Sequence, residues 1–213
     1  MGTIKQGILG GFSGKVGTVI GSCWKGKSCM RSIAQNVKNP RTEAQMAQRM
    51  RFKATTDFLS SMLPFIHEGY KNHAKNMTEY NAAQSYLLNN AVTGEYPDIA
   101  LNYEMVLVSR GKLQKALGAR AESDSGSIKI TWEDNSDMPG ASADDIAMAV
   151  VYDTEAKEAF YTTRGEGRRR GNPREVINIP ARAAGHSLMT YLSFVSKDGR
   201  IVSDSVFCGE VHI

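Results

Sequence analysis

The chain begins with a glycine-rich, cationic segment that is poorly suited to form a hydrophobic core by itself. Eight glycines precede Pro40, and a glycine loses much conformational freedom on folding while offering no side chain to bury. The first 53 residues carry ten Lys or Arg and one acid, Glu43, whereas the remaining 160 carry 16 Lys or Arg and 21 acids. We therefore expect a cationic arm before an ordinary folded body, an asymmetry that points to binding or assembly rather than catalysis.

The rest of the composition fits a soluble globular body. The 213 residues are 41% hydrophobic and 23% charged, which is enough to build a core. Lys5, Lys15 and several glycines interrupt the first apolar stretch, so we expect no signal peptide and a chain that stays in the cytoplasm. Residues Ile20–Cys23 superficially resemble a lipoprotein cleavage site, and this alternative stays open.

Residues 15–31 alternate in a way that predicts a β-hairpin, with Gly26 at the turn. If the loop has three residues centred on Gly26, Cys23 and Cys29 face each other directly across the two strands. We expect two small, half-buried thiols in a reducing compartment, with a cross-strand disulfide as the alternative. We define the basic arm as residues 1–38.

Residues 39–98 predict a small helical bundle. Thr42 and Gln45 have the spacing of a capping box, and apolar residues then recur at helical spacing. Pro64 is expected to end or kink this first helix, and a short helical piece follows it. A further helix is expected over residues 78–92.

From about Glu104 onward the pattern changes to strands. An inward-facing Trp132, a later Tyr191 on a long strand and a tight Asp198–Gly199 turn together resemble the fibronectin type III layout. This resemblance implies an antiparallel β-sandwich, and an adhesion or spacer module more readily than an enzyme. The fold class is therefore expected to be α+β, with the sandwich at residues 99–213. The expected strands are 105–108, 127–132, 146–152, 159–163, 176–179, 188–195 and 202–213.

No residue pattern predicts a catalytic residue, a cofactor site or a metal site. Gly10–Val16 resembles a phosphate-binding loop, but Leu9 stands where that motif requires Gly and Val16 where it requires Ser or Thr. His67 and His73 are six residues apart rather than four, so they do not share a helix face as metal ligands do. A hydrolase with an unfamiliar site stays as a minor alternative.

The N-terminal cations are the strongest candidates for binding a partner. Arg49 and Lys53 are one helical turn apart, Trp24 offers a surface for stacking, and Arg168–Arg170 form a basic loop tip. We expect docking on neighbouring protein subunits, with nucleic-acid binding as the first alternative. The complete set of candidate partner-binding residues is Lys15, Trp24, Lys25, Lys27, Arg31, Lys38, Arg41, Arg49, Lys53, Arg168, Arg169 and Arg170.

A dense motif spans about residues 10–53, and weaker similarity continues at Asn102–Tyr103 and Ser109–Gly111. The motif resembles an uncharacterised family common in Bacteroidetes genomes, and small proteins encoded among the structural genes of tailed phages and prophages. We expect a non-enzymatic protein that is oligomeric or part of a larger assembly, without membrane association, since no apolar run approaches the ~20 residues that span a bilayer. The resemblance itself implies a component of a virion or another assembly, found in the virion or the cytoplasm, with a docking arm and an outward β module. It implies no activity and no catalytic residue. The motif consists of Gly14–Gly21, Trp24–Lys27, Met30–Ser32, Asn39–Gln45 and Gln48–Arg49.

Overall fold

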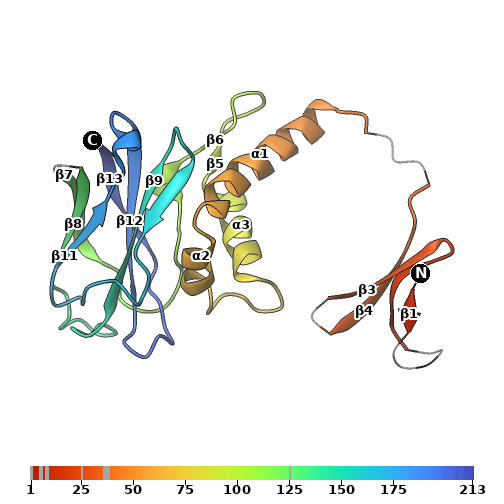
Figure 1. Cartoon of the computed structure of the whole chain (residues 1–213), viewed down its shortest axis with the longest axis horizontal. Coiled ribbons are helices and arrows are strands. Elements are labelled where there is room, and N and C mark those ends of the chain that lie inside the picture. Colours follow the sequence, from red (N-terminus) through yellow and green to blue (C-terminus); the bar gives the residue numbers. More distant parts are fainter. Residues whose placement is uncertain (1, 5–6, 8–9, 25, 36–38, 125) are drawn as a thin grey trace. The chain divides into compact units, whose positions relative to one another are not determined.

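The computed structural model describes residues 2–4, 7, 10–24, 26–35, 39–124 and 126–213 (Figure 1). The chain divides into two compact units, residues 1–42 and residues 43–213. Helices occur in the second unit and antiparallel sheets in both, so the predicted α+β class is confirmed. The finer boundaries expected at residues 38 and 98 stay predictions.

The first unit is a four-stranded antiparallel sheet with the order β1-β2-β3-β4. The predicted hairpin is present as β3 and β4, and Gly26 adopts a φ of 80°, the left-handed conformation that tight hairpin turns require. Two strands that precede this hairpin extend the sheet beyond what the sequence predicts. The strands are β1 (Thr3–Ile4), β2 (Phe12–Val16), β3 (Val19–Trp24) and β4 (Lys27–Ser32).

The register of this hairpin shows that the expected pairing of Cys23 with Cys29 is wrong. Trp24 pairs with Lys27, so the connection has two residues rather than three. Cys23 therefore lies opposite Ser28, and Cys29 lies opposite Ser22. Because side chains alternate between the faces of a sheet, the two thiols lie on opposite faces. Both are free and exposed, so neither the cross-strand disulfide nor the half-buried pair is present.

The second unit begins with α1 (Glu43–Ser60), α2 (Leu63–Gly69) and α3 (Glu79–Asn90). Pro64 lies in the first turn of α2, where a missing backbone N–H costs nothing. The first helix thus ends before Pro64, and the short helix that follows begins beside it. The hydroxyl of Thr78 accepts a hydrogen bond from the backbone N–H of Asn81 at 3.2 Å and caps α3.

Two antiparallel sheets follow, with the orders β10-β9-β12-β13 and β11-β8-β7. Strand β7 was not predicted, because its sequence shows mostly exposed positions with only small residues inward. A short β5–β6 ladder and the 3₁₀ helices η1 (Tyr103–Met105) and η2 (Ala181–Ala183) join these elements. The strands are β5 (Val92–Thr93), β6 (Ala100–Leu101), β7 (Leu117–Asp124), β8 (Ser127–Glu133), β9 (Ile146–Asp153), β10 (Glu158–Tyr161), β11 (Arg174–Asn178), β12 (Ser187–Val195) and β13 (Val206–His212).

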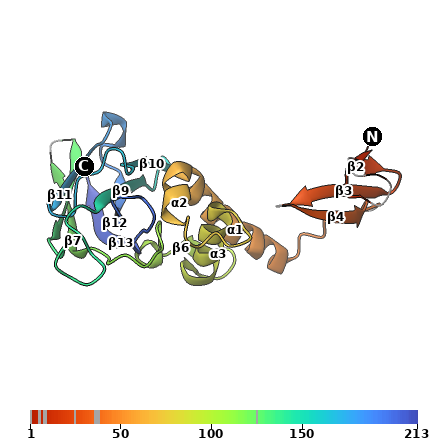
Figure 2. The same ribbon diagram turned by 90° about the horizontal axis from the view of Figure 1, so that it is seen from below.

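The β9–β12 sheet is buried on both of its faces. Ala147 and Val151 of β9 face the other sheet, in a cluster with Ile128 and Ile130. Met148 and Val150 face the opposite way and pack in a cluster with residues of all three helices, which lie along this sheet (Figure 2). Helices and sandwich therefore share one of the two hydrophobic clusters of residues 43–213.

The strand predicted over residues 105–108 is wrong. Met105 ends η1, and the residues after it run without a ladder partner among the described strands. Val106 and Val108 are apolar because both are buried in the cluster between helices and sheet. The backbone N–H of Val108 donates instead to the Ser205 hydroxyl at 3.0 Å, which satisfies a group that a strand would have paired.

Candidate interaction surface

The N-terminal sheet gathers its cations on one face. Directly paired residues project to the same side of a sheet, and so do residues two apart along one strand. Lys15 pairs with Ile20, and Ile20 with Arg31, so these three form a row across β2, β3 and β4. Trp24 and Lys27 form a second row on the same side. We call this surface, formed by Lys15, Ile20, Trp24, Lys27 and Arg31, the cationic face.

The opposite side of the same sheet is apolar. Val16 pairs with Val19, and Gly21 with Met30. The Phe12 ring lies directly over Gly21, where a Cβ atom would collide with it, so glycine at this position lets the ring lie across the sheet. Met30 is 72% exposed and Val16 is 50% exposed. We call Phe12, Val16, Val19 and Met30 the apolar face.

Within the described part of residues 1–42, Gly2 lies against Val16 and the Phe12 ring, and much of the apolar face stays exposed. Gly21 is the one buried residue in that part, and no hydrophobic side chain there belongs to either core cluster. Phe12, with Cys23 and Ser28, also lines a hollow of about 460 Å³. Exposed apolar surface of this kind is typical of a site that another molecule covers.

The remaining N-terminal candidates lie outside this sheet. Arg41 is exposed and adopts a φ of 50° just before α1. Arg49 and Lys53 lie on α1 and line one hollow of about 380 Å³ with the half-exposed Phe52, so they share a helix face as predicted. Lys25 and Lys38 lie outside the described residues.

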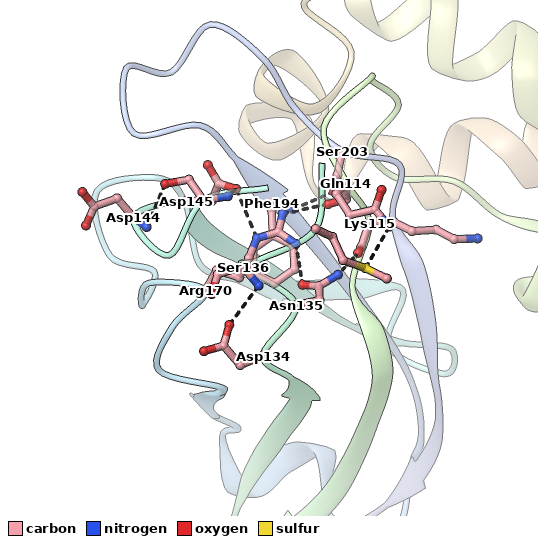
Figure 3. Close-up of polar contacts among 12 residues, drawn as sticks. Gln114, Lys115, Asp134, Asn135, Ser136, Asp144, Asp145, Arg170, Phe194 and Ser203 are labelled. Atoms are coloured by element: carbon pink, nitrogen blue, oxygen red, sulfur yellow. Dashed lines mark hydrogen bonds and ion pairs between the residues drawn. The ribbon is translucent and has the colours of Figure 1, made fainter. Parts of the chain in front are cut away.

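The prediction that Arg170 belongs to an exposed basic loop tip is wrong. Its side chain is 0% exposed and is therefore not available to a partner. Its Nε donates to the Asp145 carboxylate at 3.1 Å, one Nη to the Asn135 side-chain carbonyl at 2.7 Å, and the other to the backbone carbonyl of Gln114 at 2.7 Å. The guanidinium lies 3.8 Å from the centroid of the Phe194 ring. Figure 3 shows these groups converging on Arg170 inside the sandwich end.

The partners of Arg170 are themselves held in place. Asp145 accepts a second hydrogen bond from the backbone N–H of Ser142 at 2.8 Å, and Asn135 donates to the backbone carbonyl of Lys115 at 3.0 Å (Figure 3). Burial lowers the pKa of the Arg170 guanidinium, and the Asp145 charge opposes that effect. These additional hydrogen bonds satisfy the remaining polar atoms of the buried Arg170–Asp145 ion pair, as a stable buried pair requires.

The two other arginines of this loop are exposed. Arg169 pairs with Asp144 at 2.8 Å, and Lys197 binds the same carboxylate at 2.9 Å. The Lys197 hydrogen bond, with the Lys197 and Arg169 charges, lowers the pKa of Asp144. The backbone N–H of Arg168 donates to the buried Glu175 carboxylate at 2.7 Å. Only Arg168 and Arg169 of the predicted tip therefore present their charge to solvent.

The strongest histidine–carboxylate contact lies at the end of the sandwich. His186 Nδ1 lies 2.7 Å from Asp153 Oδ2, and Asp153 is buried. This hydrogen bond, followed by the Asp153 and Glu155 charges, raises the pKa of His186. Asp153 also accepts two backbone N–H groups that begin the β9–β10 turn, which explains the pair as a structural feature of that turn.

Within the described ranges, no three His, Cys, Asp or Glu side chains gather closely enough to hold a metal ion. Of the helices built from those residues, none joins sufficient length to the apolarity that a bilayer-crossing segment needs.

In comparison with known proteins, a single family model covers parts of both units. The model of a family of unknown function, DUF6266, matches residues 11–209. The chain belongs to the DUF6266 family. No curated protein matches it. The DUF6266 match begins at β2 and ends within β13, so most of the N-terminal sheet and the body belong to one family module. Membership of an uncharacterised family is thereby confirmed, whereas the link to Bacteroidetes or phages stays a prediction.

Sequence reasoning missed how this surface is arranged. Cations and apolar residues alternate along the arm, but their assignment to two faces depends on the register, which the two-residue connection at Gly26 sets. The tight hairpin was the one signal that could have separated the faces of the sheet.

Proposed function

We propose that this protein is a non-enzymatic structural or assembly protein that docks on neighbouring copies of itself through residues 1–42. The observation that carries the proposal is the N-terminal sheet with its exposed apolar face and its cationic face. A sheet whose apolar side stays largely exposed among the described residues gains free energy when another surface buries that side. A single buried side chain of the size of Met or Val contributes about 1.5–3 kcal/mol.

The distribution of charge supports a second copy as the occupant. Residues 1–42 contain seven Lys or Arg and no acid, whereas residues 43–213 contain 19 Lys or Arg and 22 acids. The arm of one copy is thus attracted to the body of another. Such head-to-tail contact is heterologous, so it builds rings or open filaments, which are the forms that assembly proteins take.

The sheet also presents an open edge. Every residue of β4 is exposed, and β4 is the outermost strand of its sheet. An edge strand offers unpaired backbone groups to an incoming strand. Lys27 and Arg31 on β4 limit indiscriminate pairing through their charge, so this edge favours a partner that can neutralise them.

The body suits the role of a rigid module. Of its seven main strands, β7, β8 and β11 form one sheet, and β9, β10, β12 and β13 form the other. Apart from the position of β10, immunoglobulin-type sandwiches divide their strands between the two sheets in the same way. This supports the fibronectin type III-like part of the proposal. For the kind of assembly, the resemblance to proteins encoded among phage structural genes supports a virion component.

The second candidate function is nucleic-acid binding, which the cationic face favours specifically. Lys15, Lys27 and Arg31 lie on one side of the sheet with the indole of Trp24, which is 53% exposed. Cations that neutralise phosphates beside an aromatic ring that stacks on bases are the two parts of a single-strand binding surface. Binding of this kind weakens steeply with salt.

Point variants of the two faces separate the candidates. We expect Met30→Ser to weaken self-association about tenfold or more, because it removes apolar area from the docking surface. Met105→Ser is the matched control, since Met105 is also an exposed methionine but lies on the body. The association constant is measured by size-exclusion chromatography with light scattering over a range of concentrations.

The cationic variant completes this test. Lys27→Gln with Arg31→Gln is compared with Lys115→Gln with Arg120→Gln, which removes the same charge from exposed positions on the body. A chain that stays monomeric, yet binds single-stranded DNA in a salt-dependent way that only the first pair abolishes, would replace docking with nucleic-acid binding. Equal effects of Met30→Ser and Met105→Ser on association would also contradict the proposed docking surface.

A further inference from the structure

A second basic surface lies on the body, between the α2–α3 loop and the segment that follows η1. It consists of two adjoining hollows of about 340 Å³ and 430 Å³. Arg110 and Tyr86 help to line the first, Lys75 and Lys112 help to line the second, and His73 lines both. We call Arg110, Lys112, Lys75 and His73, with the hollows that they line, the basic groove.

The permanent cations of the basic groove keep their charge available. Among the residues that the structure describes, no ion pair involves Arg110, Lys112 or Lys75, whereas Lys71, Lys157 and Lys197 are all paired with carboxylates. The Arg110 guanidinium lies 5.4 Å from the Tyr86 ring centroid, which orients it along the groove wall. Asp204 is the acid whose charge acts on His73, and its carboxylate already accepts the backbone N–H of Gly111 at 2.9 Å.

The backbone that carries Arg110 and Lys112 is fixed. The Ser109 hydroxyl donates to the Ser203 carbonyl at 2.7 Å, and the backbone N–H of Arg110 donates to the Gly69 carbonyl at 3.0 Å. A Cβ atom on Gly111 would collide with the Val202 carbonyl, so only glycine allows this close approach. The segment is therefore clamped between α2 and the β12–β13 loop, and its cations are placed before any ligand arrives.

We propose that the basic groove binds a small anion of the phosphate class, with Arg110 and Lys112 as its principal ligands. Arginine matches the oxygens of a phosphate with two parallel N–H donors, and lysine adds a point charge. The two hollows together exceed what a single orthophosphate needs, so a diphosphate or a phosphate ester fits the space better. Asn72 and Asn90 also line the hollows. Their amide nitrogens already donate to the Arg200 and Tyr86 backbone carbonyls, at 2.9 Å and 2.8 Å, so each has one further N–H for a ligand.

The lowered pKa of His73 agrees with a groove that binds an anion. Burial, and then the charges of Arg110, Lys112 and Lys75, lower the pKa of His73, while Asp204 opposes them. Tyr70 and Tyr86 also line the first hollow, and burial raises the pKa of Tyr70, whose hydroxyl donates to the Leu107 carbonyl at 2.9 Å. An anion bound among these cations cancels part of their repulsion, so it must raise the pKa of His73.

The direct test is calorimetric titration of the full chain with inorganic pyrophosphate at pH 7 and low ionic strength. We expect saturable binding, and Arg110→Gln and Lys112→Gln each to weaken it about tenfold or more. Arg120→Gln and Lys115→Gln are the matched controls, because both residues are exposed cations of the same unit outside the groove. Titrations with orthophosphate and glycerol 3-phosphate distinguish free phosphate from an ester as the source.

A second readout follows His73 by NMR, with its resonance assigned through His73→Gln. Saturating pyrophosphate should raise the pKa of His73 and leave that of His186 unchanged, since His186 does not line the groove. Absence of saturable binding, or an unchanged His73, would overturn the proposal. So would an equal loss of affinity in the groove and control variants, because that would show diffuse attraction instead of a site.

Discussion

Replacing Arg170 with alanine should lower the free energy of unfolding by about 3–5 kcal/mol, one of the two largest single-residue effects that we expect. The reason is the charge that the substitution leaves behind. Asp145 has only 3% of its side chain exposed, and without Arg170 its carboxylate is a buried and uncompensated anion. Asn135 and the Gln114 carbonyl also lose their donors. Urea unfolding of both proteins measures the difference directly.

Arg169→Ala is the matched control, since the adjacent arginine is exposed and pairs with an exposed carboxylate. Surface ion pairs contribute about 0–1 kcal/mol, so this variant should unfold almost like the native chain. The double change of Arg170→Met with Asp145→Leu should recover most of the loss, because it removes both charges together. If Arg170→Ala costs no more than Arg169→Ala, the buried network does not stabilise the sandwich end.

Phe58→Ala should lower the free energy of unfolding by about 3–5 kcal/mol. Phe58 is 1% exposed, and its ring centroid lies 4.7 Å from that of Tyr152 in an edge-on arrangement, with Tyr103 and Tyr191 next to it. It belongs to the cluster shared by the helices and the β9–β12 sheet. Phe52→Ala, on the same helix but half exposed, should change stability by about 0.5 kcal/mol or less.

The same cluster predicts how the second unit unfolds. In a Trp24→Phe background, fluorescence of Trp132 reports on the sandwich, while far-ultraviolet circular dichroism reports mainly on the helices. Because Phe58 joins both parts in one core, the two signals should change together. Separate transitions, or equal costs for Phe58→Ala and Phe52→Ala, would show that helices and sandwich are stabilised independently.

The elements that the sequence predicted well carry local signals. Pro64 and the Thr78 cap mark where α2 and α3 begin, and Gly26 marks the hairpin turn. Strand β8 alternates cleanly because one of its faces lies in the core. Strand β9 is apolar from Ile146 to Tyr152 since both of its faces are buried, and an apolar run of that length was still recognised as a strand.

The sequence-based predictions fail where contacts between residues distant in the sequence determine the structure. The run 105–108 reads as a strand, but Val106 and Val108 fill the core without pairing. Strand β7 has no apolar repeat, and a φ of 60° at Gly118 with a register shift interrupts its ladder. Nothing local distinguishes Arg170 from Arg168 and Arg169. Its burial depends on Asp145, Asn135 and Phe194, which come from three different parts of the sandwich.

For the interaction surface, the sequence predicted which residues are cationic but not how they are arranged. The pairing of Lys15, Ile20 and Arg31 in one row, and of Gly21 with Met30 on the other side, follows from the β2–β4 register. Two of the glycines that suggested a flexible arm have specific roles in the sheet. Gly26 forms the turn, and Gly21 makes room for the Phe12 ring.

The most direct test of the docking unit is sedimentation velocity of the full chain beside residues 43–213, at matched concentrations and low salt. Residues 43–213 keep both core clusters, so the shorter chain is expected to fold. We predict that the full chain forms dimers or larger species in a concentration-dependent manner, whereas residues 43–213 sediment as a monomer. If the two chains sediment with the same stoichiometry at every concentration, residues 1–42 do not mediate assembly.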